Sequence, residues 1–355
     1  MNRVKYIGLD VHQATIVAAV LDDSGKLVMQ SILETKATAI LEFLHGLSGT
    51  LQVTFEEGTW STWLHDLLLP HVAKLVVCNP RKNALLKDGS KSDKIDARKL
   101  AELLRADMLS PVYHRDSGVR QLKELARSYS ALTKDTIRVM NRLKSLYRSR
   151  AIACAGRQVY APRQRALWLE RLSETGQHRR AEPLCQQLDA LQALRQQARR
   201  DLLREARRHP AASQLRQVPC FGPVRVALFI AQVQTPFRFR SKRQFWTYCG
   251  LAVETHGSAE YRFVAGQLAR SKRAVLVRGL NDHYNHELKN VLKGATTLAC
   301  SRPGPFHDFY LALLDKGMKP AMARLTLTRK MAAVTLLLWK KGERFDAQQL
   351  KPQAA

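Results

Sequence analysis

The stretch Tyr6-Ile-Gly-Leu-Asp10-Val-His12 is an apolar, β-prone run that ends in an acid. Two further short apolar runs, 16–21 and 26–30, follow after a polar break and an acidic turn. Runs of this length joined by tight turns predict an antiparallel meander. An acid at the end of a buried strand is either a turn-former or a ligand, because burying a charge is costly unless a partner such as a divalent cation pairs with it. Matching carboxylates elsewhere in the chain decide between these interpretations.

The charge of the chain is its most unusual bulk property. Its 355 residues include 58 Lys and Arg against 30 Asp and Glu, a formal net charge of +28. Such an excess points to a polyanionic partner, and we expect nucleic acid. A membrane surface is the weaker alternative, because no strongly basic amphipathic helix stands apart from the globular segments. The length leaves room for two or three domains that each bury a core.

We expect a cytoplasmic protein without membrane association. The chain starts directly with a strand pattern instead of a signal peptide, and no apolar run approaches the length of a membrane span. The six cysteines are scattered and form no CxxC pair. They are therefore expected to be reduced and mostly buried, and neither a zinc site nor a disulfide framework is supported.

The elements after the meander predict an RNase H-like fold. Residues 38–47 have the pattern of a short helix, 51–55 of a strand, 60–69 of a helix and 74–78 of a further strand. The order of three strands, helix, strand, helix, strand is that of the RNase H-like fold, which holds metal ions with carboxylates on its first strand, its fourth strand and a late helix. The fourth strand ends in Glu56. We choose Glu56 over Glu57 because successive strand residues point to opposite faces.

The third element of that pattern follows as Lys91-Ser-Asp93-Lys-Ile-Asp96, which opens a helix. Asp93 and Asp96 are three residues apart, so both side chains lie on one face of the first turn. Two anions in one turn repel each other unless a cation lies between them. First-turn acids can also merely favour the helix dipole. Together with Asp10 and Glu56, the pair predicts a metal site built from four carboxylates.

The middle of the chain predicts two long basic helices. Residues 119–150 and 165–208 carry apolar side chains at helical spacing, with Arg and Lys on much of the remaining surface. A break between them suggests an antiparallel hairpin or coiled coil. An oligomerisation arm with solvated charges would share this pattern, but the excess of Arg favours a grip on a phosphate backbone. The arginines expected to bind nucleic acid here are Arg195, Arg199, Arg200 and Arg204.

The C-terminal region is predicted to be mostly helical. Val218-Pro-Cys-Phe-Gly-Pro223 resembles the turn of a helix-hairpin-helix, whose backbone N–H groups can meet a phosphate. Residues 254–262 have the pattern of a polar loop and 269–273 that of the basic start of another helix, with helices at 306–316 and 321–340 and a loose tail. The basic residues expected to bind nucleic acid here are Arg270, Lys272 and Arg273. The expected domains are 1–112 (α/β), 113–209 (helical middle) and 210–346 (C-terminal), with 347–355 as the tail.

These residues resemble the insertion sequence 110 family of transposases, and more closely its insertion sequence 1111 subgroup, over nearly the whole length. Its members are DEDD-type, bridge-RNA-guided DNA recombinases. The most specific pieces are the stretches 6–10, 91–98, 218–223 and 248–251, in that order. The resemblance implies a RuvC-like first domain in which Asp10, Glu56, Asp93 and Asp96 bind Mg²⁺ or Mn²⁺. It also implies a serine nucleophile in a polar loop, a place that Ser258 occupies.

The function implied is a transposase that cleaves and exchanges DNA strands. The resemblance implies as partners donor and target DNA, a structured non-coding guide RNA, and further copies of the chain as dimers that pair into a tetramer. It also implies a bacterial or archaeal cytoplasm and association with the nucleoid. A metal-dependent nuclease or junction resolvase is the alternative, and it would need the four acids but not Ser258. A non-catalytic nucleic-acid scaffold would need only the basic helices. Replacing Asp10 separates the scaffold from the two enzymes, and replacing Ser258 separates the enzymes from each other.

Overall fold

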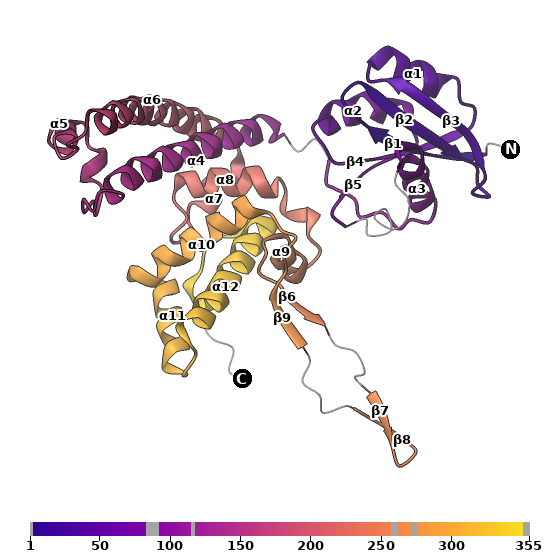
Figure 1. Cartoon of the computed structure of the whole chain (residues 1–355). Helices are drawn as coiled ribbons and strands as arrows, with labels where there is room; N and C mark the ends of the chain where they lie inside the picture. Colours follow the sequence, from indigo (N-terminus) through magenta and orange to yellow (C-terminus); the bar gives the residue numbers. More distant parts are fainter. Residues whose placement is uncertain (1–2, 83–91, 115–117, 257–260, 271–275, 351–355) are drawn as a thin grey trace. The chain divides into compact units, whose positions relative to one another are not determined.

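The computed structural model describes residues 3–82, 92–114, 118–256, 261–270 and 276–350 (Figure 1). The chain divides into two compact units, 1–115 and 116–355. The boundary between the two units falls close to residue 112, where the sequence predicts the end of the α/β domain. The second unit contains both the long helices and the C-terminal region, which the sequence analysis separates at residue 210.

The first unit is a mixed β-sheet flanked by helices. The strand order is β3-β2-β1-β4-β5; β1, β2 and β3 form an antiparallel meander, and β4 and β5 run parallel to β1. This is the predicted order of elements, and it is consistent with an RNase H-like domain. The strands are β1 Val4–Val11, β2 Thr15–Leu21, β3 Leu27–Glu34, β4 Thr50–Glu56 and β5 Lys74–Cys78, and the helices are α1 Ala37–His45, α2 Ser61–Leu68 with the 3-10 turn η1 Leu69–His71, and α3 Asp93–Arg105.

The two faces of this sheet have different partners. Ile7 and Leu9 of β1 belong to a core cluster that includes Ile40 of α1 and Leu64 of α2. Because side chains alternate along a strand, Gly8 faces the other way, where Ala97 of α3 packs with residues of β2. The sheet therefore lies between α1 and α2 on one side and α3 on the other.

The second unit begins with two long helices, α4 Arg120–Arg148 and α6 Thr175–Ala206, which lie side by side (Figure 1). Leu122 near the start of α4 shares a core with Leu202 near the end of α6, whereas Leu143 shares a separate core with Ala181 near the start of α6. The helices are therefore antiparallel. The turn between them contains η3 Gln158–Tyr160, η4 Pro162–Gln164 and α5 Arg165–Leu169, so the helix expected from residue 165 is interrupted.

The remaining helices surround one large core. Phe229, Phe245, Leu292 and Met331 are buried in it, and Leu350 (4% exposed) closes it from the end of the described chain. The tail expected to be loose from residue 347 instead forms the 3-10 turn η6 Ala347–Leu350, because the apolar side chain of Leu350 finds a place in this core. The helices are α7 Pro210–Leu215, α8 Pro223–Val233, α9 Lys242–Tyr248, α10 His286–Ser301, α11 Pro305–Asp315 and α12 Pro320–Lys341, with η5 Pro236–Arg238.

Strands interrupt this helical region where the sequence analysis expects a polar loop and a basic helix. β6 Val253–His256 pairs with β9 Leu276–Leu280, and β7 Tyr261–Val264 pairs with β8 Gln267–Arg270. The helix expected to open at residue 269 is therefore wrong. Ala265 (φ +51°) and Gly266 (φ +80°) form a two-residue turn of positive φ, the geometry that joins hairpin strands, and strand pairing overrides the local pattern. A mixed α/β sheet followed by a mostly helical remainder is confirmed.

The described part of the chain also shows the apolarity of the helices and the state of the cysteines. No helix in that part is both long enough and apolar enough to cross a bilayer. All six cysteines lie within the described residues and are free thiols, four of them buried.

Candidate metal centre

Asp10 lies near the carboxyl end of β1, beside Glu56 at the end of β4. In the parallel pair of these strands Leu9 is opposite Phe55, and both side chains are in the core. Asp10 and Glu56 follow one residue later, so alternation turns both toward the opposite face of the sheet. That face is the one covered by α3, which carries the other predicted acids.

Gly8 determines how closely α3 approaches this face. A Cβ at Gly8 would lie 2.1 Å from the backbone oxygen of Ala97 and 2.6 Å from the backbone nitrogen of Ala101. No side chain fits there, because real Cβ atoms do not approach backbone atoms at such distances. The absence of a side chain at Gly8 therefore lets the helix lie directly on β1 and brings its first turn close to Asp10.

The first turn of α3 presents two carboxylates. Ser92 caps the helix, and its Oγ accepts a hydrogen bond from the backbone N–H of Ile95 at 3.3 Å. Asp93 and Asp96 follow in that turn. Oδ1 of Asp96 is buried and has no hydrogen-bond partner in the described chain. A buried acceptor without a donor is expensive, and a bound cation would satisfy it.

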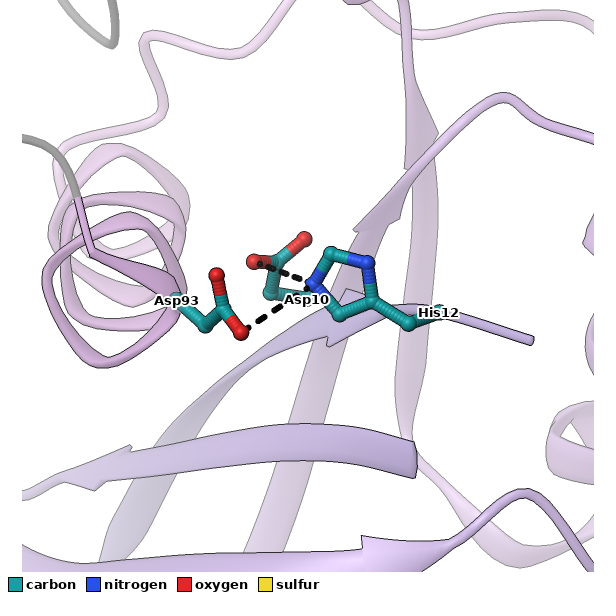
Figure 2. Close-up of side chains that lie close together, drawn as sticks. All are labelled: Asp10, His12 and Asp93. Carbon is teal, nitrogen blue, oxygen red and sulfur yellow. Dashed lines mark hydrogen bonds and ion pairs between the residues drawn. The ribbon is translucent and has the colours of Figure 1, made fainter. Parts of the chain in front are cut away.

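Figure 2 shows the imidazole of His12 beside the carboxylates of Asp10 and Asp93, with one ring nitrogen close to both. Its Nε2 lies 3.2 Å from Oδ2 of Asp10 and 3.5 Å from Oδ2 of Asp93. One ligand atom from each of the three residues lies within 4.8 Å of the others, as required of groups that share one cation. The carboxylates of Asp10 and Asp93 thus converge on a point that is also reached by an imidazole nitrogen.

The sequence pattern did not predict a role for His12. The signal that could have found it is its spacing from Asp10. β1 ends at Val11, and His12 follows it directly. If the alternation of side chains continues for one residue beyond the strand, an Asp-x-His sequence turns both side chains to the same face. Imidazole is a common metal ligand, and it also pairs with carboxylates.

Burial and crowding of acids perturb the charge of Asp10. Desolvation raises the pKa of this carboxyl above its ordinary value, His12 opposes the shift, and Asp93 and Asp96 add to it by repulsion. A raised pKa means that the ionised form is under-compensated in the metal-free protein. The donor set of carboxylate oxygens with one imidazole suits a divalent cation, which would supply the missing positive charge.

The two glutamates Glu56 and Glu57, at the end of β4 and directly after it, are distinguished by their environment. Glu56 is half-buried and is the last residue of β4, whereas Glu57 is exposed and its backbone N–H donates to the oxygen of Cys78 at 2.8 Å. Neither belongs to the group formed by Asp10, His12 and Asp93, which does not include Asp96 either. The structure thus brings two of the four predicted acids together with His12 and leaves the other two beside them.

The remaining predicted site residues fall in the second unit. Ser258, Lys272 and Arg273 lie outside the described residues, and Arg270 is the last residue of β8. On α6, Arg199, Arg200 and Arg204 are exposed and Arg195 is half-buried. Nη1 of Arg204 lies 3.4 Å from Oδ1 of Asp201, so part of this basic surface is neutralised within the helix.

Two family models match the chain. A model of DEDD-type transposases, described as Transposase, matches residues 7–149, and a model described as Transposase IS116/IS110/IS902 family matches residues 212–280. No curated protein matches the chain. These matches define a transposase, an enzyme that acts on DNA. The chain belongs to the IS110 family of transposases, whose two models together cover more than half of its length.

Family and geometry agree on the chemistry of the first unit. The DEDD-type model spans Asp10 and the first turn of α3, and the group of Asp10, His12 and Asp93 lies inside the matched residues. Both findings indicate a divalent metal. The identification as an enzyme also removes the non-catalytic scaffold from the alternatives.

Proposed function

We propose that this transposase exchanges DNA strands with a divalent metal held by Asp10, Glu56, Asp93 and Asp96 and with Ser258 as nucleophile. A structured non-coding RNA would select donor and target DNA by base pairing, as in the bridge-RNA-guided insertion sequence 1111 subgroup. The observation that supports the metal half of the proposal is the convergence of Asp10, His12 and Asp93 on the face of the sheet that α3 covers.

The acids on this face would hold Mg²⁺ or Mn²⁺. Such a cation supplies charge stabilisation at the scissile phosphate and helps to activate a nucleophile. Asp10 and Asp93 would contribute the carboxylate oxygens that already converge, and Oδ1 of Asp96 would gain the partner that it lacks. Glu56 would complete the set, because it follows Phe55 on the neighbouring parallel strand as Asp10 follows Leu9, the register partner of Phe55.

The serine step would be a transesterification. A bond forms between Oγ of Ser258 and the scissile phosphorus, the phosphodiester bond to the leaving strand breaks, and the hydroxyl proton ends on the leaving oxygen. A serine hydroxyl is a poor nucleophile unless it is activated, which is why the acidic site has to act on the same phosphate. Reversal of this step with another strand end would complete the exchange without a net loss of phosphodiester bonds.

Ser258→Ala tests the serine step. The variant should abolish recombination and the covalent protein–DNA adduct, detected as a shifted band on a denaturing gel, while folding and RNA binding survive. Asp10→Asn should abolish cleavage and leave nucleic-acid binding intact. A Ser258→Ala protein that still recombines DNA would favour the alternative function, a metal-dependent nuclease or junction resolvase.

Dimers that pair into a tetramer would allow one chain to supply the acids and another the serine. Mixing Asp10→Asn chains with Ser258→Ala chains tests this arrangement, because one intact composite site could form in a mixed assembly. Recovery of activity supports sites built between subunits. Two inactive variants that stay inactive when mixed would place both halves of each site in one chain.

Guide-RNA binding is proposed for the basic surface of α6. Replacing Arg195, Arg199, Arg200 and Arg204 with Gln should weaken RNA binding and lower its salt dependence by roughly one unit of slope for each phosphate that the variant no longer neutralises. The salt slope is measured by filter binding between low and physiological ionic strength. An unchanged salt slope would mean that these arginines contact solvent and do not bind phosphates.

A further inference from the structure

Two tryptophans at the start of α2 are exposed to solvent. Trp60 is 39% exposed and Trp63 is 37% exposed. Their rings form an edge-to-face pair with centroids 5.9 Å apart. The other three tryptophans of the chain also lie in the described residues: Trp168 is 7% exposed, and Trp246 and Trp339 pack against the large core. A pair of indoles left in water next to a well-packed core is unusual for a surface without a partner.

The pair lies at the same edge of the sheet as the acidic site. β1 and β4 are parallel, so Asp10 and Glu56 both lie where these strands end. A tight turn follows Glu56, in which Oγ of Ser61 donates to the oxygen of Gly58 at 2.8 Å, and α2 begins there. Leu64 fixes the helix to the core one turn further on. The indoles are thereby held at this edge.

The neighbouring strand adds positive charge to this edge. β5 is parallel to β4 and therefore ends on the same side, and the turn after it exposes Arg81 and Lys82. The backbone N–H of Arg81 donates to Oδ1 of Asn79 at 3.0 Å, and that of Lys82 donates to the oxygen of Asn79 at 3.0 Å. One edge of the sheet thus presents metal-binding acids, an aromatic pair and two cations.

The acids, indoles and cations at this edge indicate which kind of molecule binds there. Arg and Lys attract phosphates, and aromatic rings stack on bases regardless of their identity. Paired bases inside a duplex cannot reach a ring on the protein surface, so the occupant has unpaired bases. An apolar peptide would satisfy the indoles but not the cations. A single strand of nucleic acid satisfies both.

We propose that Trp60 and Trp63 stack on an unpaired base of the DNA strand whose phosphate is presented to the acidic site. DNA is chosen over RNA because the acids at this edge act on DNA in a transposase. That choice rests on the proposed function, whereas the stacking itself rests on the exposed indoles and the basic turn. The pair would hold the strand open beside the scissile phosphate without reading its sequence.

Binding of labelled oligonucleotides to the full-length protein tests the proposal. The probes are a single-stranded oligothymidine, a single-stranded RNA and a DNA duplex, all of equal length. Their binding is measured by fluorescence anisotropy without divalent metal. Trp60→Ala/Trp63→Ala should weaken single-strand binding about tenfold or more, a size typical of losing base–aromatic stacking. Duplex binding and the salt slope should stay unchanged, because the substitutions remove no cationic side chain from the phosphates.

Two variants serve as controls. Trp60→Phe/Trp63→Phe keeps aromatic faces and should retain most of the single-strand affinity, which separates stacking from a loss of folding. Leu69→Ala removes another exposed apolar side chain, 53% exposed, at the far end of α2 and should change nothing. Because metal is absent, single-strand binding does not depend on metal held by Asp10 or on catalysis by Ser258. The binding result therefore stays interpretable even if the proposed strand-exchange function is wrong.

A photo-crosslink locates the base. An oligonucleotide that carries 5-iodouracil should crosslink to Trp60 or Trp63 in the wild-type protein, as identified by mass spectrometry of the peptide. Unchanged single-strand binding in the alanine double variant would overturn the proposal. An equal loss on single strand and duplex would overturn it as well, and so would a loss confined to single-stranded RNA of the same length.

Discussion

Nε2 of His12, the residue directly after β1, lies 3.2 Å from Oδ2 of Asp10, which comes two positions earlier near the end of that strand. The same nitrogen is 3.5 Å from Asp93, which belongs to a helix more than eighty positions away in the sequence. The imidazole therefore lies where the two carboxylates converge. A cation shared by the acids would have to bind beside this ring or exchange places with it.

Removing the charge of Asp10 should stabilise the metal-free protein while it eliminates metal binding. Burial raises the pKa of Asp10 above 3.8, so the folded chain binds this proton more tightly than the unfolded chain does. Stability from this group is thus present at low pH and is lost as the pH rises through the raised pKa. At neutral pH, Asp10→Asn should raise the Tm without metal, as measured by scanning calorimetry.

Added Mg²⁺ or Mn²⁺ should stabilise the wild-type protein but not Asp10→Asn. A ligand that binds only the folded state stabilises it by about 2.7 kcal/mol at a hundredfold excess over Kd. The wild-type Tm should therefore rise with metal, whereas the Tm of Asp10→Asn should not respond. A variant that still responds fully to metal would show that the cation binds elsewhere.

His12→Gln should change which metal the protein prefers. An imidazole nitrogen favours transition metals over Mg²⁺, while carboxylates alone suit Mg²⁺. We expect the variant to lose at least about tenfold in Mn²⁺ affinity and much less in Mg²⁺ affinity, a size comparable to the effect of removing a group that supports a metal ligand. Isothermal titration of each metal measures both values. Equal losses for the two metals would mean that His12 only pairs with the acids.

Gly8→Ala should disrupt the site without touching any acid. The new methyl group would meet backbone atoms of Ala97 and Ala101, so α3 would have to move away from β1. We expect a loss of roughly 1–3 kcal/mol of stability, as for overpacking in a core, together with a smaller metal-induced rise in Tm. Gly58→Ala is the matched control, because nothing lies within 4 Å of a Cβ there. If Gly8→Ala retains the wild-type metal response, the close approach of α3 is not what forms the site.

The protein should lose stability at high pH through Tyr147 of α4. Burial raises the pKa of Tyr147 to about 12, and its ring packs edge-to-face on Trp168 with centroids 5.3 Å apart. The folded state keeps the phenol proton after the unfolded chain has lost it, so stability falls as the pH rises from 10 toward 12. Urea unfolding followed by circular dichroism at pH 9 and pH 11 should show this loss.

Replacing Tyr147 with Phe isolates that effect from the other tyrosines. Tyr147→Phe should have a smaller loss of stability between the two pH values than the wild-type protein. Tyr160→Phe is the comparison, because burial also raises the pKa of Tyr160 but that side chain is only half-buried. The expectation fails if the two variants lose stability equally with pH.

Much of the first unit could be predicted from the sequence, because its signals are local. The meander, the strand that ends in Glu56 and the helix that opens at Asp93 each follow from periodicity, turn residues and caps. The spacing of Asp93 and Asp96 places them in one helical turn, whichever fold contains that helix. In the second unit, Gly266 is a hairpin signal, but the basic residues that follow it favour a helix by their local pattern, and the helix prediction was wrong there.

The sequence by itself determined which elements carry the acids, since hydrogen-bonding patterns and amphipathic periods are encoded within a few residues. Only the tertiary structure decided that Gly8 receives the backbone of Ala97, and that His12 rather than Glu56 meets Asp10 and Asp93. These contacts join β1 to a helix far along the chain. Their distances depend on how the sheet and α3 pack, and packing is a property of the whole unit that no local pattern contains.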